Sequence, residues 1–267
     1  MSSQKKQFEN LEILRVGRFP GKINTTCIVY RLGCTLIDTG PPNQWKEVKK
    51  FIYEKDVKQI CITHHHEDHS GNTAQIQEAT SAQVFAHHQG CKWMKNGWYM
   101  EPYRHLIWGR PTKFEAQTAP SKLNLDNNLS LNCISTPGHS DDSLCFLEPN
   151  KGWLFTGDLY ITSHPHSLRI DENPHEQIKS LEYLLNLEFE FLMCAHRGVV
   201  KNGKNAINNK LKYLKELRDE IIYLDSKGVS QTEIRKRLLG RETLVSLLTL
   251  FNFCKQNFVR NMILYNN

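Results

Sequence analysis

The sequence predicts a mixed α/β (α+β) fold in which two β-sheets lie between layers of helices, followed by a helical C-terminal extension. Three observations favour this fold. Strand-like and helical patterns alternate through the first 200 residues, some neighbouring strands are close enough to pair as hairpins, and an apolar stripe with helical spacing follows residue 201. We therefore expect one domain over residues 1–200 and a basic helical extension over 201–267.

The expected elements of the domain are short strands rich in β-branched residues and helices with apolar periodicity. The first half contains strands at 11–16, 25–31 and 33–38, a helix at 44–55, a strand at 57–62, a helix at 72–80 and a strand at 83–86. The second half contains strands at 129–135, 144–148 and 152–156, a helix at 174–187 and a strand at 189–194.

The extension after residue 201 is predicted to be helical throughout. Ser230 and Glu233 fit a capping box, and Gly240 fits the position just past a helix end. Residues 243–264 are apolar enough to form a further helix. The apolar stripe is made of Leu211, Leu214, Leu217, Ile221 and Leu224.

Composition is that of an ordinary globular protein, with 39% hydrophobic and 23% charged residues. No stretch approaches the roughly 18 apolar residues of a transmembrane helix, so we expect no membrane association. The polar start, residues 1–7, lacks the apolar core of a secretory signal. The eight cysteines contain no C-x-x-C pair and are interpreted as buried free thiols, with a disulfide framework as the alternative. These features predict a cytoplasmic protein.

The net charge of +6 is unevenly distributed. Residues 201–267 hold 13 Lys and Arg against 6 Asp and Glu, whereas the first 200 residues hold 21 against 22. A nearly neutral domain disfavours a polyanion groove at its site. The extension is expected to cover a sheet edge or form a homodimer contact, and a nucleic-acid-binding helix-turn-helix module is the alternative.

A run of histidines and acidic residues follows the strand at 57–62. Its fixed positions His64, His66, Asp68 and His69 supply three imidazoles and a carboxylate, which are costly to bury without a partner. Imidazole and carboxylate together suit zinc, iron or manganese. The run is predicted to lie on a loop at the C-terminal end of its strand, and a surface histidine cluster is the alternative. It reads His64-His65-His66-Glu67-Asp68-His69.

Three later segments place similar residues after strands. His139 lies on the turn Thr136-Pro137-Gly138-His139-Ser140, Asp158 ends the strand at 152–156, and His196 follows the strand at 189–194. Each is weak alone, because a histidine after a strand is more often a capping or solvated residue. In this order, and together with the first run, they indicate one metal site.

These residues resemble the five ordered motifs of the metallo-β-lactamase superfamily. The matching positions, across about residues 25–200, are Asp38, His64-x-His66-x-Asp68-His69, His139, Asp158 and His196. The pattern is similar to glyoxalase II-like thioester hydrolases and to lactonases. Authentic β-lactamases are less similar, because they usually lack a carboxylate at the place of Asp158. The resemblance implies an αββα sandwich with two metal ions at one edge of the paired sheets.

The resemblance also implies a role for each residue. One metal would be held by His64, His66 and His139, and the second by Asp68, His69 and His196, with Asp158 bridging the two. Asp38 would orient the ligand loop from behind. His65 and Glu67 alternate with the ligands and are expected to point away from the metals, where they would either support the ligands or face solvent. Gly71 would let the backbone turn beneath the site.

The expected cofactor is a pair of divalent ions, zinc first, with iron and manganese as the other ions that suit the ligands. Such a pair lowers the pKa of a shared water from about 15.7 to near 7 and so supplies a metal-bridging hydroxide. We expect this hydroxide to cleave an ester, thioester or lactone of a small-molecule substrate. Tyr160 is a candidate hydrogen-bond donor to the tetrahedral intermediate, with a packed core tyrosine as the alternative. His164 and His166 are interpreted first as surface residues.

Residues 91–118 are interpreted as a lid or pocket wall that sets specificity. The alternative is a helical hairpin that buries its rings on the domain. Interleaved aromatic and cationic residues could also stack nucleobases. The aromatic residues are Trp93, Trp98, Tyr99, Tyr103, Trp108 and Phe114.

Three other functions are weighed against the hydrolase. The first is a metal-dependent phosphodiesterase or nuclease, which would add nucleic acid as a partner. The second is an iron-dependent sulfur dioxygenase, which the full ligand set including Asp68 and His196 disfavours. The third is a non-enzymatic, metal-retaining binding protein.

Overall fold

The computed structural model describes residues 3–19, 23–126 and 128–266, so the first two residues of the polar N-terminal stretch lie outside it. Two units emerge from the contacts within the chain. The first unit comprises the chain up to Ser135, Asp142–Asp158 and Phe189–Gly203. The second comprises Thr136–Asp141, Leu159–Glu188 and the chain from Lys204 onward. The division near residue 200 that charge and periodicity suggest stays a prediction.

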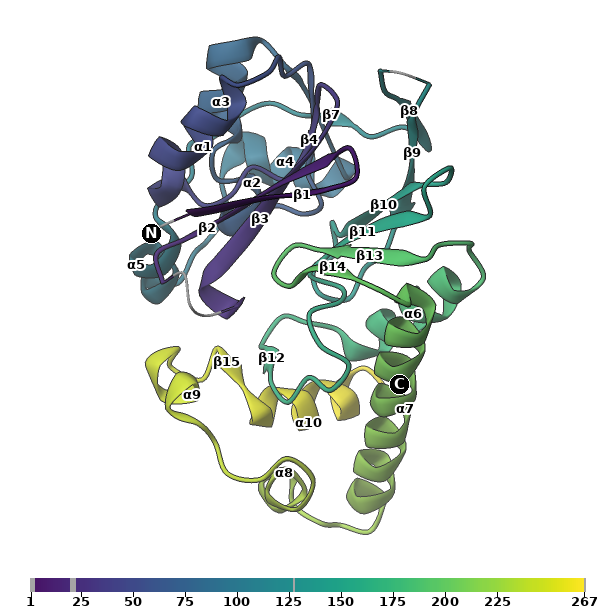
Figure 1. Cartoon of the computed structure of the whole chain (residues 1–267). Helices are drawn as coiled ribbons and strands as arrows, with labels where there is room; N and C mark the ends of the chain where they lie inside the picture. The colour runs from purple at the N-terminus through teal and green to yellow at the C-terminus, as the bar shows by residue number, and fades with distance from the viewer. Residues whose placement is uncertain (1–2, 20–22, 127, 267) are drawn as a thin grey trace. The chain divides into compact units, whose positions relative to one another are not determined.

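The first unit contains a seven-stranded sheet whose strands follow sequence order (Figure 1). Strands β1 to β4 are antiparallel hairpin neighbours, and β4 to β7 are parallel. The strands are β1 (Ser3–Phe8), β2 (Leu11–Gly17), β3 (Thr26–Leu32), β4 (Thr35–Ile37), β5 (Gln59–Cys61), β6 (Gln83–Ala86) and β7 (Gln117–Thr118).

A second sheet of six strands belongs to the same unit. Its order is β14-β13-β11-β10-β9-β8, and only the pair β11 and β13 is parallel. The strands are β8 (Lys122–Asn124), β9 (Ser130–Ser135), β10 (Leu144–Glu148), β11 (Trp153–Gly157), β13 (Phe191–Cys194) and β14 (Gly198–Val200).

Two apolar clusters hold the first unit together. The cluster between the sheets joins Ile28 and Tyr30 of the first sheet with Phe146 and Phe155 of the second. The other cluster packs helices on the opposite face of the seven-stranded sheet (Figure 1). These helices are α1 (Trp45–Ile52), α3 (Thr73–Thr80) and α4 (His88–Asn96). The two paired sheets of the predicted αββα fold, and its helical layer on the seven-stranded sheet, are thereby confirmed for this unit.

Short helical elements complete the first unit. They are η1 (Ile23–Thr25), η2 (Pro42–Gln44), α2 (Glu67–Ser70) and α5 (Pro102–Trp108). Residues 91–118 therefore form most of α4, all of α5 and strand β7. Trp108 and Phe114 bury their rings, whereas Tyr99 is 79% exposed.

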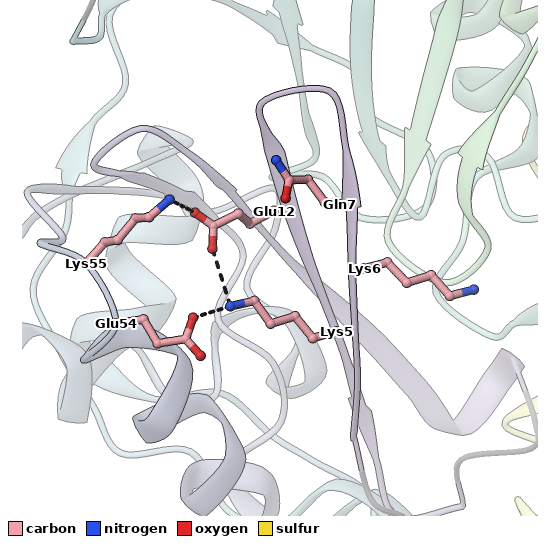
Figure 2. A pocket seen from close by; sticks show the side chains of 6 residues that line it. All are labelled: Lys5, Lys6, Gln7, Glu12, Glu54 and Lys55. Carbon is pink, nitrogen blue, oxygen red and sulfur yellow. Dashed lines mark hydrogen bonds and ion pairs between the residues drawn. The ribbon is translucent and has the colours of Figure 1, made fainter.

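A polar cavity of about 460 Å³ lies beside the hairpin of β1 and β2 (Figure 2). At its centre Glu12 pairs with Lys55 at 2.5 Å, with Lys5 at 3.7 Å and with the fully buried Arg31 at 3.5 Å. None of the predicted ligands lines this cavity. Its ion pairs join the edge strand β1, through Lys5, to Glu12 and Glu54. The lining is Lys5, Lys6, Gln7, Glu12, Glu54 and Lys55.

The second unit is mainly helical. The predicted apolar stripe is buried at Leu211, Leu214, Leu217 and Ile221 of α7. The remaining elements are β12 (Leu168–Arg169), α6 (Pro174–Leu185), α7 (Gly203–Ser226), α8 (Gln231–Leu239), α9 (Leu244–Leu248), β15 (Phe253–Cys254) and α10 (Lys255–Leu264).

The N-cap at Ser230 and the helix end at Gly240 are confirmed, whereas the Glu233 carboxylate, expected to complete the capping box, accepts a hydrogen bond from Arg237 at 3.0 Å. The Ser230 hydroxyl accepts a hydrogen bond from the Glu233 N–H at 3.3 Å, and Gly240 ends the helix with a φ of +77°. The single helix expected over 243–264 is wrong. Leu250 and Phe251 adopt φ values of +49° and +59°, which end α9, and the chain forms β15 before α10 begins. Periodicity alone could not show this break, because no glycine or proline marks it.

Two further expectations can be compared with the described part of the chain. All eight cysteines are free thiols. No helix among the described residues has the length and apolar character needed to cross a bilayer.

Candidate metal centre

The histidine run lies where β5 ends, as its sequence predicts. The chain leaves the sheet at Cys61, and His64, His66 and the one-turn helix α2 follow. Every side chain of the expected ligand set on this loop is buried, the most exposed being Asp68 at 6%. Nε2 of His64 lies 2.9 Å from Nδ1 of His66. Such crowding of imidazoles in the protein interior is a strong indication of a shared ligand.

The two sheets bring Asp158 and His196 to the same loop. Oδ1 of Asp158, just after β11, lies 3.3 Å from Nε2 of His69 and 3.0 Å from Nε2 of His196. Oδ2 of Asp68 lies 3.6 Å from each of the same nitrogens. Among the described residues of the first unit, two groups of three residues have ligand atoms within 4.8 Å of one another. One is His64, His69 and Asp158, and the other is Asp68, His69 and His196.

The outward nitrogens of two imidazoles are already occupied. Nδ1 of His69 lies 2.7 Å from Oδ2 of Asp38, and Nδ1 of His196 lies 2.5 Å from the Thr26 carbonyl oxygen. Because both partners are acceptors, each Nδ1 is the donor in its contact, and each Nε2 is the nitrogen that can bind a cation once any proton on it is displaced. Nε2 of His69 is buried and makes no hydrogen bond to any described residue. The donor set therefore fits a divalent cation.

Electrostatics at the centre keep Asp158 ionised. Burial would raise the pKa of this carboxyl, but the charges of His196 and His69 hold it well below its usual range. Burial acts in the opposite direction on His196, yet the Asp158 carboxylate raises the pKa of that imidazole above its ordinary value. A cation that binds here must displace imidazole protons.

Asp38 supports the ligand loop from behind. Its Oδ1 accepts hydrogen bonds from the Thr63 N–H at 2.9 Å and from the Thr63 hydroxyl at 3.0 Å. Its Oδ2 binds His69, so one carboxylate fixes both the start of the loop and a ligand imidazole. Asp38 holds a φ of +60°, a conformation that few non-glycine residues adopt.

Gly71 allows the backbone beneath the site to pack closely against Glu67 and Pro42. Its φ of −62° is open to any residue, but a Cβ there would meet the Glu67 carbonyl and the Pro42 ring, each at 2.2 Å. The expectation that Gly71 lets the backbone turn in a way that only glycine allows is therefore wrong, and the glycine provides steric room instead.

The cysteines near the centre are neutral thiols. Burial raises the pKa of Cys27 to about 12 and that of Cys194 to about 11, and it holds the pKa of Cys61 well above the ordinary value. These thiols pack in the core, as expected of Cys61 and Cys194, and none offers a thiolate at neutral pH.

Four candidate residues belong to the second unit. Nδ1 of His139 lies 3.2 Å from Oε2 of Glu172. The Tyr160 hydroxyl lies 3.1 Å from the Ser163 hydroxyl and is buried. His164 and His166 both lie against the ring of Tyr213. Their roles at the metal centre stay predictions.

The two residues that alternate with the ligands are not solvated. Glu67 is completely buried against Arg104, and His65 is bound by Asp142. Arg104 and Asp142 are not among the sequence-based candidates. A charged residue inside a buried loop requires a partner of opposite charge, but nothing in the sequence shows which of the many cations supplies it.

The chain is similar in sequence to several known proteins. The sequence model of the metallo-beta-lactamase superfamily matches residues 18–196. Lactamase-like protein aptB of Emericella nidulans is 23% identical over 222 residues, covering 79% of this chain and 63% of that protein. A hydroxyacylglutathione hydrolase of Bartonella tribocorum is 30% identical over 189 residues, covering 68% and 65%. Thioesterase pkgB of Emericella nidulans is 29% identical over 171 residues, covering 62% and 43%. The chain thus spans less than two thirds of the length of each.

Solved structures share the fold. A metallo-beta-lactamase family protein of Thermus thermophilus superposes with a TM-score of 0.67 at 18% identity, covering 96% of this chain and 91% of that one. A beta-lactamase domain protein of Burkholderia ambifaria superposes with a TM-score of 0.72 at 14% identity, covering 98% and 88%.

Proposed function

Because this chain belongs to the metallo-β-lactamase superfamily, we propose that it is a dinuclear metal-dependent hydrolase of esters, thioesters or lactones. One observation carries the proposal. A single ionised oxygen of Asp158 faces the Nε2 atoms of both His69 and His196, and the same residue also groups with His64 and His69. A carboxylate placed between two sets of imidazoles is suited to join two cations.

The proposed ligands follow the order of the motifs. His64, His66 and His139 would hold one ion, Asp68, His69 and His196 the other, and Asp158 would join them. Zinc is the first choice, since the set has imidazole and carboxylate donors and no thiolate. Bound ions would supply a hydroxide nucleophile at neutral pH and a Lewis acid for the developing oxyanion.

The chain's own residues prepare the centre for this chemistry. Asp38 and the Thr26 carbonyl hold protons on Nδ1 of His69 and His196, which leaves their Nε2 atoms as acceptors of an ion. The negative charge of Asp158 offsets the repulsion between two cations. Tyr160 is proposed to donate a hydrogen bond to the oxyanion that develops on the substrate carbonyl.

A thioester is the preferred substrate class. The relatives named above include a hydroxyacylglutathione hydrolase and a thioesterase. The near-neutral charge of residues 1–200 gives no support to a polyanionic substrate. We propose that the substrate is a small-molecule thioester or ester and not a nucleic acid. We also propose that the protein is cytoplasmic.

Metal analysis of purified protein followed by a hydrolysis panel tests the proposal. We expect two metal equivalents and cleavage of a thioester or a lactone. Asp158→Ala should lose at least one equivalent and nearly all turnover. The matched control Asp219→Ala changes a carboxylate that is 66% exposed on α7 and should retain both.

Three outcomes would contradict the proposal. Retention of both ions and full turnover by Asp158→Ala would remove the bridging role. Cleavage of bis-p-nitrophenyl phosphate alone would favour a phosphodiesterase. A metal-loaded protein inert toward thioesters, lactones and phosphodiesters would favour a binding protein.

A further inference from the structure

Glu67 is a buried charge in the middle of the ligand loop. It lies between His66 and Asp68 and has no exposed surface. Its Oε1 accepts a hydrogen bond from Nε of Arg104 at 2.7 Å, and its Oε2 accepts a second from Nη2. The two planar groups therefore meet in a bidentate pair, a geometry that a lysine could not reproduce.

Arg104 projects from a helix that is itself fastened at its far end. Nη1 of Arg18 donates to the Leu106 carbonyl at 2.7 Å, and the Asn43 amide donates to the Ile107 carbonyl at 2.7 Å. Both carbonyls belong to the last turn of α5, where backbone acceptors lack helical partners. These bonds hold α5 in place, and with it the Arg104 guanidinium that binds Glu67.

The other alternating residue, His65, is held in a similar way. Asp142 accepts hydrogen bonds from the His65 backbone N–H at 2.8 Å and from its Nδ1 at 2.9 Å. The His65 ring lies 4.5 Å from the Trp93 ring and 5.3 Å from the Trp98 ring, between centroids. A Cβ on Gly90 of α4 would approach Oδ2 of Asp142 to 2.5 Å, so the helix needs glycine there.

We propose that Arg104 is a positioning residue that sets metal affinity through Glu67. Glu67 opens the one-turn helix α2, and Asp68 and His69 follow it in the same turn. A rotation of Glu67 would therefore move both of those proposed ligands. Through this pair the segment from α4 to α5, expected to form a pocket wall, also governs the geometry of the ligand loop.

The inference rests on the proposed metal centre, so the test measures metal binding rather than turnover. Zinc dissociation constants are determined by chelator competition for the full chain, and the absorption spectrum of the cobalt-loaded protein reports ligand geometry. Arg104→Lys should weaken binding of the second ion by about 10- to 100-fold, which is the usual effect of changing a residue that supports a metal ligand. The control Arg110→Lys, at an exposed position after α5, should change neither constant.

A second variant separates positioning from folding. Replacing the whole pair, in Glu67→Leu with Arg104→Met, removes both charges and leaves no uncompensated ion in the interior. We expect the metal-free form of this double variant to melt near the wild type but to show the weakened zinc binding and an altered cobalt spectrum.

The outcomes are distinguishable. Wild-type zinc constants and an unchanged cobalt spectrum in the double variant would overturn the positioning role and leave the proposed function intact. A wild type that binds one ion would overturn the dinuclear proposal; the positioning role would then stand if Arg104→Lys weakened that ion and fall if it did not. A wild type that binds no ion would overturn both.

Discussion

Replacing Asp38 with asparagine would test whether a carboxylate behind the ligand loop sets the protonation of a ligand. The residue follows β4 with a φ of +60°. Asparagine is among the few side chains that tolerate this left-handed conformation, so the backbone should be preserved. The substitution therefore exchanges one oxygen for an NH₂ group and removes one charge.

The magnitude follows from the partners of the two oxygens. Oδ1 accepts from the Thr63 N–H at 2.9 Å, and Oδ2 lies 2.7 Å from Nδ1 of His69. If the asparagine oxygen stays on Thr63, its NH₂ group faces His69 and favours the tautomer with the proton on Nε2. That nitrogen faces Asp158 at 3.3 Å and is the proposed ligand atom. Loss of such a partner commonly weakens metal binding about 10- to 100-fold, which corresponds to about 1.4–2.7 kcal/mol.

Calorimetric titration of the metal-free protein with zinc measures this loss. Asp126→Asn is the matched control, since that carboxylate is 43% exposed and lies 3.9 Å from Nζ of Lys58. If Asp38→Asn bound zinc within about threefold of the control, the tautomer argument would be refuted, because a loss of that size is well below the expected 10- to 100-fold.

Two further predictions concern charge. Glu12→Gln leaves the buried Arg31 without its carboxylate and should lower the free energy of unfolding at pH 7 by about 3 kcal/mol. Burial acts to raise the pKa of Glu12, but the hydrogen bond from Lys55 and the charge of Arg31 hold it below its ordinary value. The stabilisation is thus present above the unfolded pKa and lost as pH falls through the folded pKa. Urea unfolding should therefore show a smaller difference in free energy of unfolding between wild type and variant at pH 3 than at pH 7. An equal difference at the two pH values would count against this assignment. For His196, burial acts to lower the pKa and Asp158 raises it above its ordinary value, so zinc must displace a proton and its affinity should fall as pH drops through that pKa. Titrations in buffers of different ionisation enthalpy check this, and equal heats in all of them would contradict it.

The parts of the fold that could be predicted are those with local signals. The strand before the histidine run, the cap at Ser230 and the end of α8 at Gly240 each depend on residues within a few positions of one another. The convergence of Asp158 and His196 on the loop at His64 was predictable only through the order of motifs, because no local pattern brings strand ends together.

The parts that could not be predicted depend on long-range partners. Strand β1 has the polar sequence SQKKQF, and it pairs because β2 offers a free edge; its lysines are typical of an edge strand. Arg104 is one of several cations between residues 91 and 118, and only the packing of α5 selects it for Glu67. The sequence around residue 250 is mostly apolar, so it gives no sign of the turn that the backbone makes at Leu250 and Phe251.

The candidate centre needs its two sheets held at a fixed offset, because its ligands come from both. Apolar packing between sheets has no preferred direction and would tolerate sliding. Directional bonds near the ligands supply the missing constraint: the Ile28 N–H donates to the Ala195 carbonyl at 2.7 Å, and the Tyr30 hydroxyl donates to the Cys194 carbonyl at 2.7 Å. The Leu144 N–H likewise donates to the Thr63 carbonyl at 2.7 Å, next to the histidine run. These bonds join the sheets at the edge where the candidate ligands meet, so the offset between the sheets is fixed without any contribution from an ion.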